Sequence, residues 1–213
     1  MRNFRHWTPR YVWDRINVAW YESRHPDNPW LTRTACDFLS SWLKPTDQVV
    51  EFGSGRSTAW FASRCRKVIS VEHDEGWFDK VSQDLVRLGL QGNVTYRMID
   101  QGHDENNINQ YLAPLLGLED NQADLVLVDG LHRDHCALAS LPKVRPGGLV
   151  VVDNVNWFLW REPASRSPAS RTKAKGDSSA LWSRFREDVS DWRVFWTTNG
   201  VSDTAIWQRP APV

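Results

Sequence analysis

A glycine-rich turn is the first segment whose residue types suggest chemistry. The sequence EFGSGRST (residues 51–58) follows a short apolar run and precedes a helical pattern. Gly53 and Gly55 would let the backbone turn tightly and approach a ligand, and the helix behind them offers free N–H groups. Glu72 ends the next apolar run, 17 residues after Gly55, where a carboxylate can accept both hydroxyls of a ribose. The segment predicts an adenosine-type ligand; the alternative is a turn with only a structural role.

A second group of polar residues follows two later apolar runs. Asp129 begins the sequence DGLH, and Asp153 is followed by Asn154. In an open α/β sheet, both positions face the ligand crevice. Three convergent oxygen donors suit Mg²⁺ or another hard cation, so Asp129, Asp153 and Asn154 are predicted metal ligands. His132 can act as a general base near neutral pH, with helix capping as the alternative.

Strand and helix patterns alternate through the middle of the chain. Strands are predicted at 48–52, 68–72, 94–99, 123–129 and 149–152, with a closing antiparallel pair at 193–197 and 204–208. Helices are predicted at about 32–43, 57–66, 74–89, 107–117, 133–144 and 178–190. Apolar strands alternating with helices indicate an α/β fold whose mostly parallel sheet is covered on both faces.

Two arginine-rich segments flank this pattern. Residues 1–46 interleave aromatic and basic side chains and are predicted to form a helical N-terminal cap that covers the substrate, with the main domain at 47–213. Residues 161–178 contain two prolines and five basic residues, which predicts a mobile basic loop. A basic lid would suit an anionic acceptor, and the N-terminal aromatics could stack on a sugar or a flat ring. A solvated loop and a packed cap are the structural alternatives.

The turn and the acid together resemble the first motifs of the class I S-adenosylmethionine-dependent methyltransferases, over about residues 47–155. A dinucleotide site would have glycine or alanine in place of Thr58, and an antiparallel last strand is foreign to it. The resemblance implies a Rossmann-like, seven-stranded sheet with an antiparallel last strand, and S-adenosylmethionine as cofactor. The expected cofactor-binding residues are Glu51, Gly53, Ser54, Gly55, Ser57, Thr58, Glu72, His73, Asp100 and Asp129. Among them, Glu51 would face the methionine amino group and Asp100 would lie near the adenine.

The acceptor end resembles the metal-dependent O-methyltransferases of the catechol, caffeoyl-CoA and bacterial macrocin types. These carry an aspartate after strand four and an Asp-Asn pair after strand five, as at Asp129, Asp153 and Asn154. The resemblance implies methyl transfer to a small-molecule hydroxyl, with Asp129 and His132 as catalytic residues and a divalent metal assisting. His132 stands where the catechol-type enzymes have lysine, which argues against catechol itself. The alternatives are a metal-independent methyltransferase, an NAD(P)-dependent oxidoreductase and a binding protein without catalysis.

The composition limits the classes of partner that the protein is expected to bind. The chain has 26 Lys and Arg residues and 26 Asp and Glu residues, so its net charge is zero, which disfavours a nucleic-acid acceptor. The three cysteines are scattered, as is typical of free thiols in a reducing compartment. The sequence has no signal-peptide pattern and no apolar run long enough for a bilayer span, so we expect a cytoplasmic protein; a homodimer is compatible with the sequence.

Overall fold

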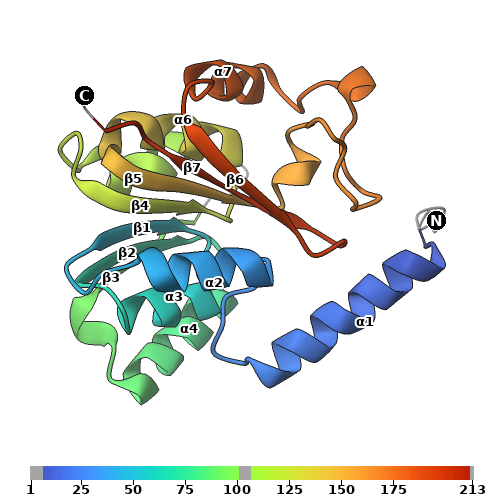
Figure 1. Cartoon of the computed structure of the whole chain (residues 1–213). Coiled ribbons are helices and arrows are strands. Elements are labelled where there is room, and N and C mark those ends of the chain that lie inside the picture. Colours follow the sequence, from blue (N-terminus) through green and yellow to red (C-terminus); the bar gives the residue numbers. More distant parts are fainter. Residues whose placement is uncertain (1–6, 101–106, 212–213) are drawn as a thin grey trace.

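The computed structural model describes residues 7–100 and 107–211 and contains one seven-stranded sheet (Figure 1). The strands are β1 (Gln48–Phe52), β2 (Lys67–Glu72), β3 (Val94–Met98), β4 (Ala123–Val128), β5 (Val144–Asp153), β6 (Arg193–Thr198) and β7 (Asp203–Gln208). Their order is β3-β2-β1-β4-β5-β7-β6, and β7 is antiparallel to both of its neighbours. The predicted sheet with its antiparallel last strand is confirmed.

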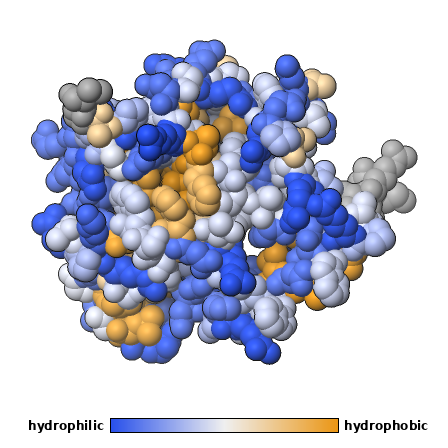
Figure 2. Space-filling view, viewed as in Figure 1, coloured by the Kyte–Doolittle hydropathy of each residue, from blue (hydrophilic) through white to orange (hydrophobic). Residues whose placement is uncertain are grey.

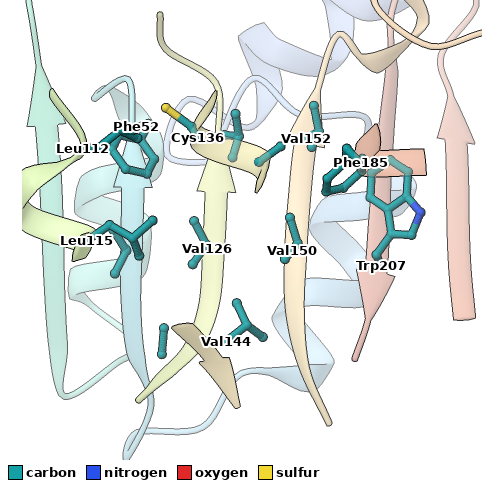
Figure 3. Packing of buried hydrophobic residues seen from close by; sticks show 14 of the residues in the cluster. Phe52, Leu112, Leu115, Val126, Cys136, Val144, Val150, Val152, Phe185 and Trp207 are labelled. Atoms are coloured by element: carbon teal, nitrogen blue, oxygen red, sulfur yellow. The ribbon is translucent and has the colours of Figure 1, made fainter. Parts of the chain in front are cut away.

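Helices cover both faces of the sheet, as the apolar strands require. The α-helices are α1 (Pro9–Arg24), α2 (Arg33–Trp42), α3 (Arg56–Ala62), α4 (Glu75–Leu88), α5 (Ile108–Leu116), α6 (Arg133–Lys143) and α7 (Ala180–Asp188). In β4, Leu125 and Leu127 pack with α2, α3 and α4, while Val126 and Val128 pack with α5, α6 and α7. This alternation follows from the two-residue period of a strand. Figure 3 shows the core on the face covered by α5, α6 and α7, where Phe52, Val126 and Val152 of the strands face Leu112, Cys136 and Phe185 of the helices.

The strand order creates a crevice at the carboxyl ends of β1 and β4. From β1 the chain proceeds to β2 on one side, whereas β4 leads to β5 on the other. The loops that follow two such strands diverge, and ligands of open α/β sheets bind at this switch point. The two polar segments singled out in the sequence, 51–58 and 129–132, are these loops.

The N-terminal segment contains two helices with different environments. Helix α2 buries Ala35, Cys36 and Leu39 against the sheet. Helix α1 is capped at its N-terminus by Thr8, whose side chain accepts a hydrogen bond from the backbone of Tyr11, and none of the 16 residues of the helix is buried. It extends away from the sheet near the β6–β7 turn (Figure 1).

The basic loop at 161–178 is anchored at several points. The side-chain amide of Asn156 donates to Ser167 and Ser170, and Asp177 forms an ion pair with Arg186. The guanidinium of Arg171 donates to backbone carbonyls of its own loop. One of the five basic side chains of the loop, that of Arg171, is therefore used within the loop itself.

Element bounds differ from the sequence-based prediction mainly at β5. This strand begins at Val144, ahead of the predicted 149, and its pairing with β4 is irregular between Ala123 and Leu125. Gly147 has φ +76, and a side chain on Gly148 would meet the backbone of Asp124, so the glycine pair belongs to an irregular part of the strand.

At the sheet edge, Figure 2 shows hydrophobic residues exposed over β6. None of the described helices is long and apolar enough to cross a membrane.

Candidate active site

The β1–α3 turn is held against the loop after β4 by a contact between two glycines. Gly53 has φ +88, and a Cβ there would lie 2.6 Å from the backbone nitrogen of Gly130. A Cβ on Gly130 would lie 2.7 Å from the nitrogen of Gly53. Gly55 is different, because a Cβ there would meet only the ring of Trp77, at 3.8 Å. Glycine is therefore required at Gly53 both by its positive φ and by the close approach of the neighbouring loop.

Glu51 is a fully buried acid beneath this turn. Its Oε2 accepts hydrogen bonds from the hydroxyls of Thr58 (2.6 Å) and Ser70 (2.7 Å), and Thr58 in turn accepts from the backbone of Gly55. Burial raises the pKa of Glu51 to about 7, against the lowering effect of the Ser57, Thr58 and Ser70 hydroxyls. Its Oε1 is buried, with no hydrogen-bond partner among the described residues. A buried carboxylate oxygen without a donor fits the cationic amino group expected of the cofactor.

Glu72, at the end of β2, ties the turn to the sheet. Its Oε2 accepts from the backbone and hydroxyl of Ser54, at 3.0 and 2.7 Å. Its Oε1 accepts from the backbones of His73 and Asp74, at 2.8 and 3.0 Å. The Ser54 hydroxyl also lies 2.5 Å from the Tyr96 hydroxyl. Because four donors already use the carboxylate, a ribose hydroxyl would have to replace the Ser54 hydroxyl.

A cavity of about 480 Å³ lies between the two loops. Its walls include Gly53 and Ser54 from the turn, Glu72 and His73 after β2, and Asp129 after β4. Trp77 also lines it and donates from its indole nitrogen to the backbone oxygen of Ser54. The cavity thus brings together half of the predicted cofactor residues in a volume suited to a small ligand.

Arg133, in the first turn of α6, lies at the far wall of this cavity. Its guanidinium forms an ion pair with Asp129 at 2.9 Å and donates to the side chain of Asn154 at 3.3 Å. Burial raises the pKa of Asp129, while Arg133 acts to lower it. The side chain of Asp129 is 30% exposed, so the acid remains accessible from the cavity.

The three predicted metal ligands do not form an open metal site. Asp153 is buried and its Oδ1 accepts from the hydroxyl of Thr204 at 2.6 Å, while Asp129 and Asn154 are bound to Arg133. Burial and the nearby Asp129 raise the pKa of Asp153 to about 8. Across residues 7–100 and 107–211, no three His, Cys, Asp or Glu side chains are arranged to hold a metal ion. The donor set does not fit a divalent metal, because a guanidinium already lies between two of its members.

The remaining predicted residues lie outside the cavity walls. His132 adopts a left-handed conformation (φ +46) at the start of α6, and its ring packs edge-on against Tyr111. Burial lowers its pKa, and so does nearby His135. Asp100 is exposed beyond β3 and accepts from Asn107 through its backbone oxygen. Ser57 and Thr58 are buried in α3 beside Glu51.

A second cavity, of about 320 Å³, lies beside the first. Asn154 lines it, and this residue is the hydrogen-bond partner of Arg133 in the wall of the first cavity. Its other walls come from α1, the segment between α1 and α2, the segment after β5 and the β6–β7 turn. They include three aromatic side chains: Tyr11, Trp30 and Trp157. The loop at 161–178 contributes only Ala169.

Sequence reasoning missed Arg133, Tyr96 and Trp157. Arg133 follows Asp129 by four residues, the spacing of neighbours on a helix face, and this signal could have suggested an ion pair. Tyr96 lies inside a strand and Trp157 is one of 13 tryptophans. Nothing in the local sequence distinguishes either of them.

Comparisons with known proteins agree with this architecture. The sequence model of a family described as a methyltransferase domain matches residues 50–155, and no curated protein matches the chain. A methyltransferase from Geobacter sulfurreducens has a similar structure, with a TM-score of 0.57, 15% identity and coverage of 93% of this chain and 88% of its own.

Two further structures have the same fold. A protein from Staphylococcus aureus, assigned as a caffeoyl-CoA O-methyltransferase, has a TM-score of 0.55 at 16% identity and covers 91% of each chain. An rRNA methylase from Streptococcus thermophilus has a TM-score of 0.51 at 16% identity and covers 82% of this chain and 93% of its own. Identities this low establish the fold alone.

The fold is that of the class I methyltransferases, with the sheet order and antiparallel β7 described above. Residues 50–155, which carry both loops of the first cavity, match a methyltransferase domain. The protein is a methyltransferase that uses S-adenosylmethionine.

Proposed function

We propose that the protein transfers a methyl group from S-adenosylmethionine to a hydroxyl oxygen of a small molecule. The observation that carries this proposal is the meeting of two cavities at the Arg133–Asn154 hydrogen bond. The first cavity would hold the cofactor and the second the acceptor. An acceptor held beside the cofactor suits methyl transfer, which requires the acceptor oxygen in line with the sulfonium methyl group.

The acceptor cavity favours a ring-bearing molecule of modest size. About 320 Å³ is at the small end of ligand cavities. Tyr11, Trp30 and Trp157 offer flat apolar surfaces, while Arg15 and Glu22 leave the charges of the wall balanced. We infer a sugar or aromatic hydroxyl compound. The basic residues of the loop at 161–178 do not line this cavity, which removes the main reason to expect an anionic acceptor.

Asp129 is the residue we propose to take the proton from the hydroxyl. It lines the cofactor cavity, and burial raises its pKa while Arg133 acts to lower it. His132 is the second candidate, although its ring packs against Tyr111 and is not part of either cavity wall. The sequence after β4, Asp129-Gly130-Leu131-His132, also lacks the Asn/Asp-Pro-Pro-aromatic motif of amino-group methyltransferases, which favours oxygen.

The test is turnover of S-adenosylmethionine carrying a ¹³C-methyl group with a panel of sugar and phenolic hydroxyl compounds. We expect release of S-adenosylhomocysteine and an O–CH₃ carbon signal in the product. Asp129→Asn should lower kcat by about 10²–10⁴-fold. Asp188→Asn, at a half-exposed position on α7, is the matched control. An N–CH₃ product, or equal kcat values for the two variants, would contradict the proposal.

A further inference from the structure

The guanidinium of Arg133 is enclosed by oxygen atoms from the loops after β4 and β5. Nε donates to the carbonyl of Gly130 at 2.9 Å, and Nη1 to the carbonyl of Asp153 at 2.6 Å and to Oδ1 of Asn154 at 3.3 Å. Nη2 contacts the carbonyl of Asp129 at 2.6 Å and its carboxylate Oδ1 at 2.9 Å. An arginine side chain has five N–H donors. Each of them therefore has an oxygen partner here.

These oxygens are the kind that a hard cation selects. The set combines one carboxylate, one side-chain amide and three backbone carbonyls, which are typical ligands of Ca²⁺ and, in part, of Mg²⁺. The side chain of Arg133 is 15% exposed, so its charge is largely removed from water. The ring of Phe158 lies 5.6 Å from the guanidinium carbon and covers it from one side. A second cation in the same place would be repelled by the fixed charge.

We propose that the guanidinium of Arg133 is the resident cation of this crevice and replaces a divalent metal. It holds Asp129 and Asn154 in place, so that cofactor binding and methyl transfer proceed without a metal ion. Arg133 is thus a positioning residue, which acts through the side chains that it binds. The statement on methyl transfer rests on the proposed function, whereas the statement on cofactor binding does not.

The first experiment uses the wild-type protein without any acceptor. Binding of S-adenosylhomocysteine is measured by calorimetry in EDTA and again in Mg²⁺, and the melting temperature is measured with Mg²⁺, Mn²⁺ and Ca²⁺. We expect the same affinity in both buffers and a melting temperature that these ions leave unchanged. A loss of affinity of tenfold or more in EDTA, or a rise in melting temperature with a divalent ion, would overturn the proposal.

The second experiment removes the guanidinium. Arg133→Ala leaves the carboxylate and the buried carbonyls without their donor and should lower the melting temperature by about 6–20 °C. Ca²⁺ should recover part of that loss in Arg133→Ala but not in the wild type, because the oxygen set is then open to an added cation. This selective recovery would not occur if Arg133 served only to stabilise the fold.

Two further variants complete the test. Arg184→Ala is the control, since Arg184 is 71% exposed and pairs with Asp188 four residues along α7. Arg133→Lys keeps the positive charge with fewer hydrogen-bond donors, and it replaces Arg133→Ala in the test if that variant does not fold. We expect Arg133→Lys to bind S-adenosylhomocysteine more weakly than the wild type does, with the same affinity in EDTA and in Mg²⁺. Equal melting temperatures for Arg133→Ala and Arg184→Ala, or metal-dependent binding by Arg133→Lys, would refute the proposal. Failure to find an acceptor would concern the proposed function alone.

Discussion

Glu51 is the buried acid whose ionisation should be visible in the stability of the protein. Its pKa is raised from 4.5 to about 7, chiefly by burial. A carboxyl whose pKa rises on folding stabilises the protein below its unfolded pKa, and this contribution is lost as the pH rises through the folded value. Between about pH 5 and pH 8.5, linkage predicts that Glu51 alone lowers the free energy of unfolding by about 2–3 kcal/mol.

Glu51→Gln removes this titration while keeping the shape of the side chain. Over the same pH range and without ligand, we expect the free energy of unfolding of the variant to fall by about 2–3 kcal/mol less than that of the wild type. The assay is urea unfolding followed by tryptophan fluorescence at several pH values. Glu187→Gln, at an exposed position of α7, is the control and should follow the wild type. A constant difference between wild type and Glu51→Gln at all pH values would refute the assignment of a raised pKa to this residue.

The same substitution tests whether Glu51 pairs with the cofactor. If its carboxylate faces the amino group, S-adenosylhomocysteine should bind about 30-fold more weakly at pH 5.5 than at pH 8, because the protonated acid cannot form the ion pair. Glu51→Gln should bind weakly at both pH values. Calorimetric titrations of the two proteins provide the comparison. Equal pH dependence in both would mean that Oε1 does not contact the ligand.

Two further outcomes follow from packing and burial. Gly130→Ala should destabilise the protein by about 1–3 kcal/mol in urea unfolding, since the new Cβ would meet the backbone of Gly53; Gly92→Ala, which has open space around it, should have no comparable effect. Burial raises the pKa of all three thiols, to about 12 for Cys36 and Cys65. A thiol reagent should therefore not label the native protein, whereas it should label all three cysteines of the unfolded protein. Rapid labelling of the native state would contradict the buried positions of the thiols.

The sheet could be predicted because its strands are short apolar runs that end at recognisable turns. The sequence of β4, ADLVLV, has no helical spacing, and a strand buried on both faces needs such continuity. Other local sequence signals are the glycines after β1, which mark a turn, and the residues that cap α4, Asp74 at its start and Gly89 at its end. The start of β5 was missed because its first residues include Pro146 and two glycines, which locally indicate a turn.

The candidate site was less predictable because side-chain direction depends on tertiary structure. Asp153 and Asn154 follow β5 as expected, yet the carboxylate of Asp153 hydrogen-bonds to Thr204, which is distant in sequence. The guanidinium that contacts Asp129 and Asn154 belongs to Arg133 on α6; its spacing from Asp129 suggests an ion pair, but nothing in the sequence indicates the contact with Asn154. Sequence patterns locate the ends of strands, but they do not reveal which cation occupies the space between them.

Under the proposed function, helix α1 separates the recognition of the acceptor from the stability of the fold. None of its residues is buried, yet it supplies Tyr11, Arg15 and Glu22 to the wall of the second cavity. Substitutions on that wall would change the shape offered to an acceptor at little thermodynamic penalty, since no core contact is lost. Acceptor preference can therefore diverge quickly among descendants of such a chain, while the sheet and its cofactor loops remain the same. This helix is also the natural element to exchange when a new acceptor is wanted.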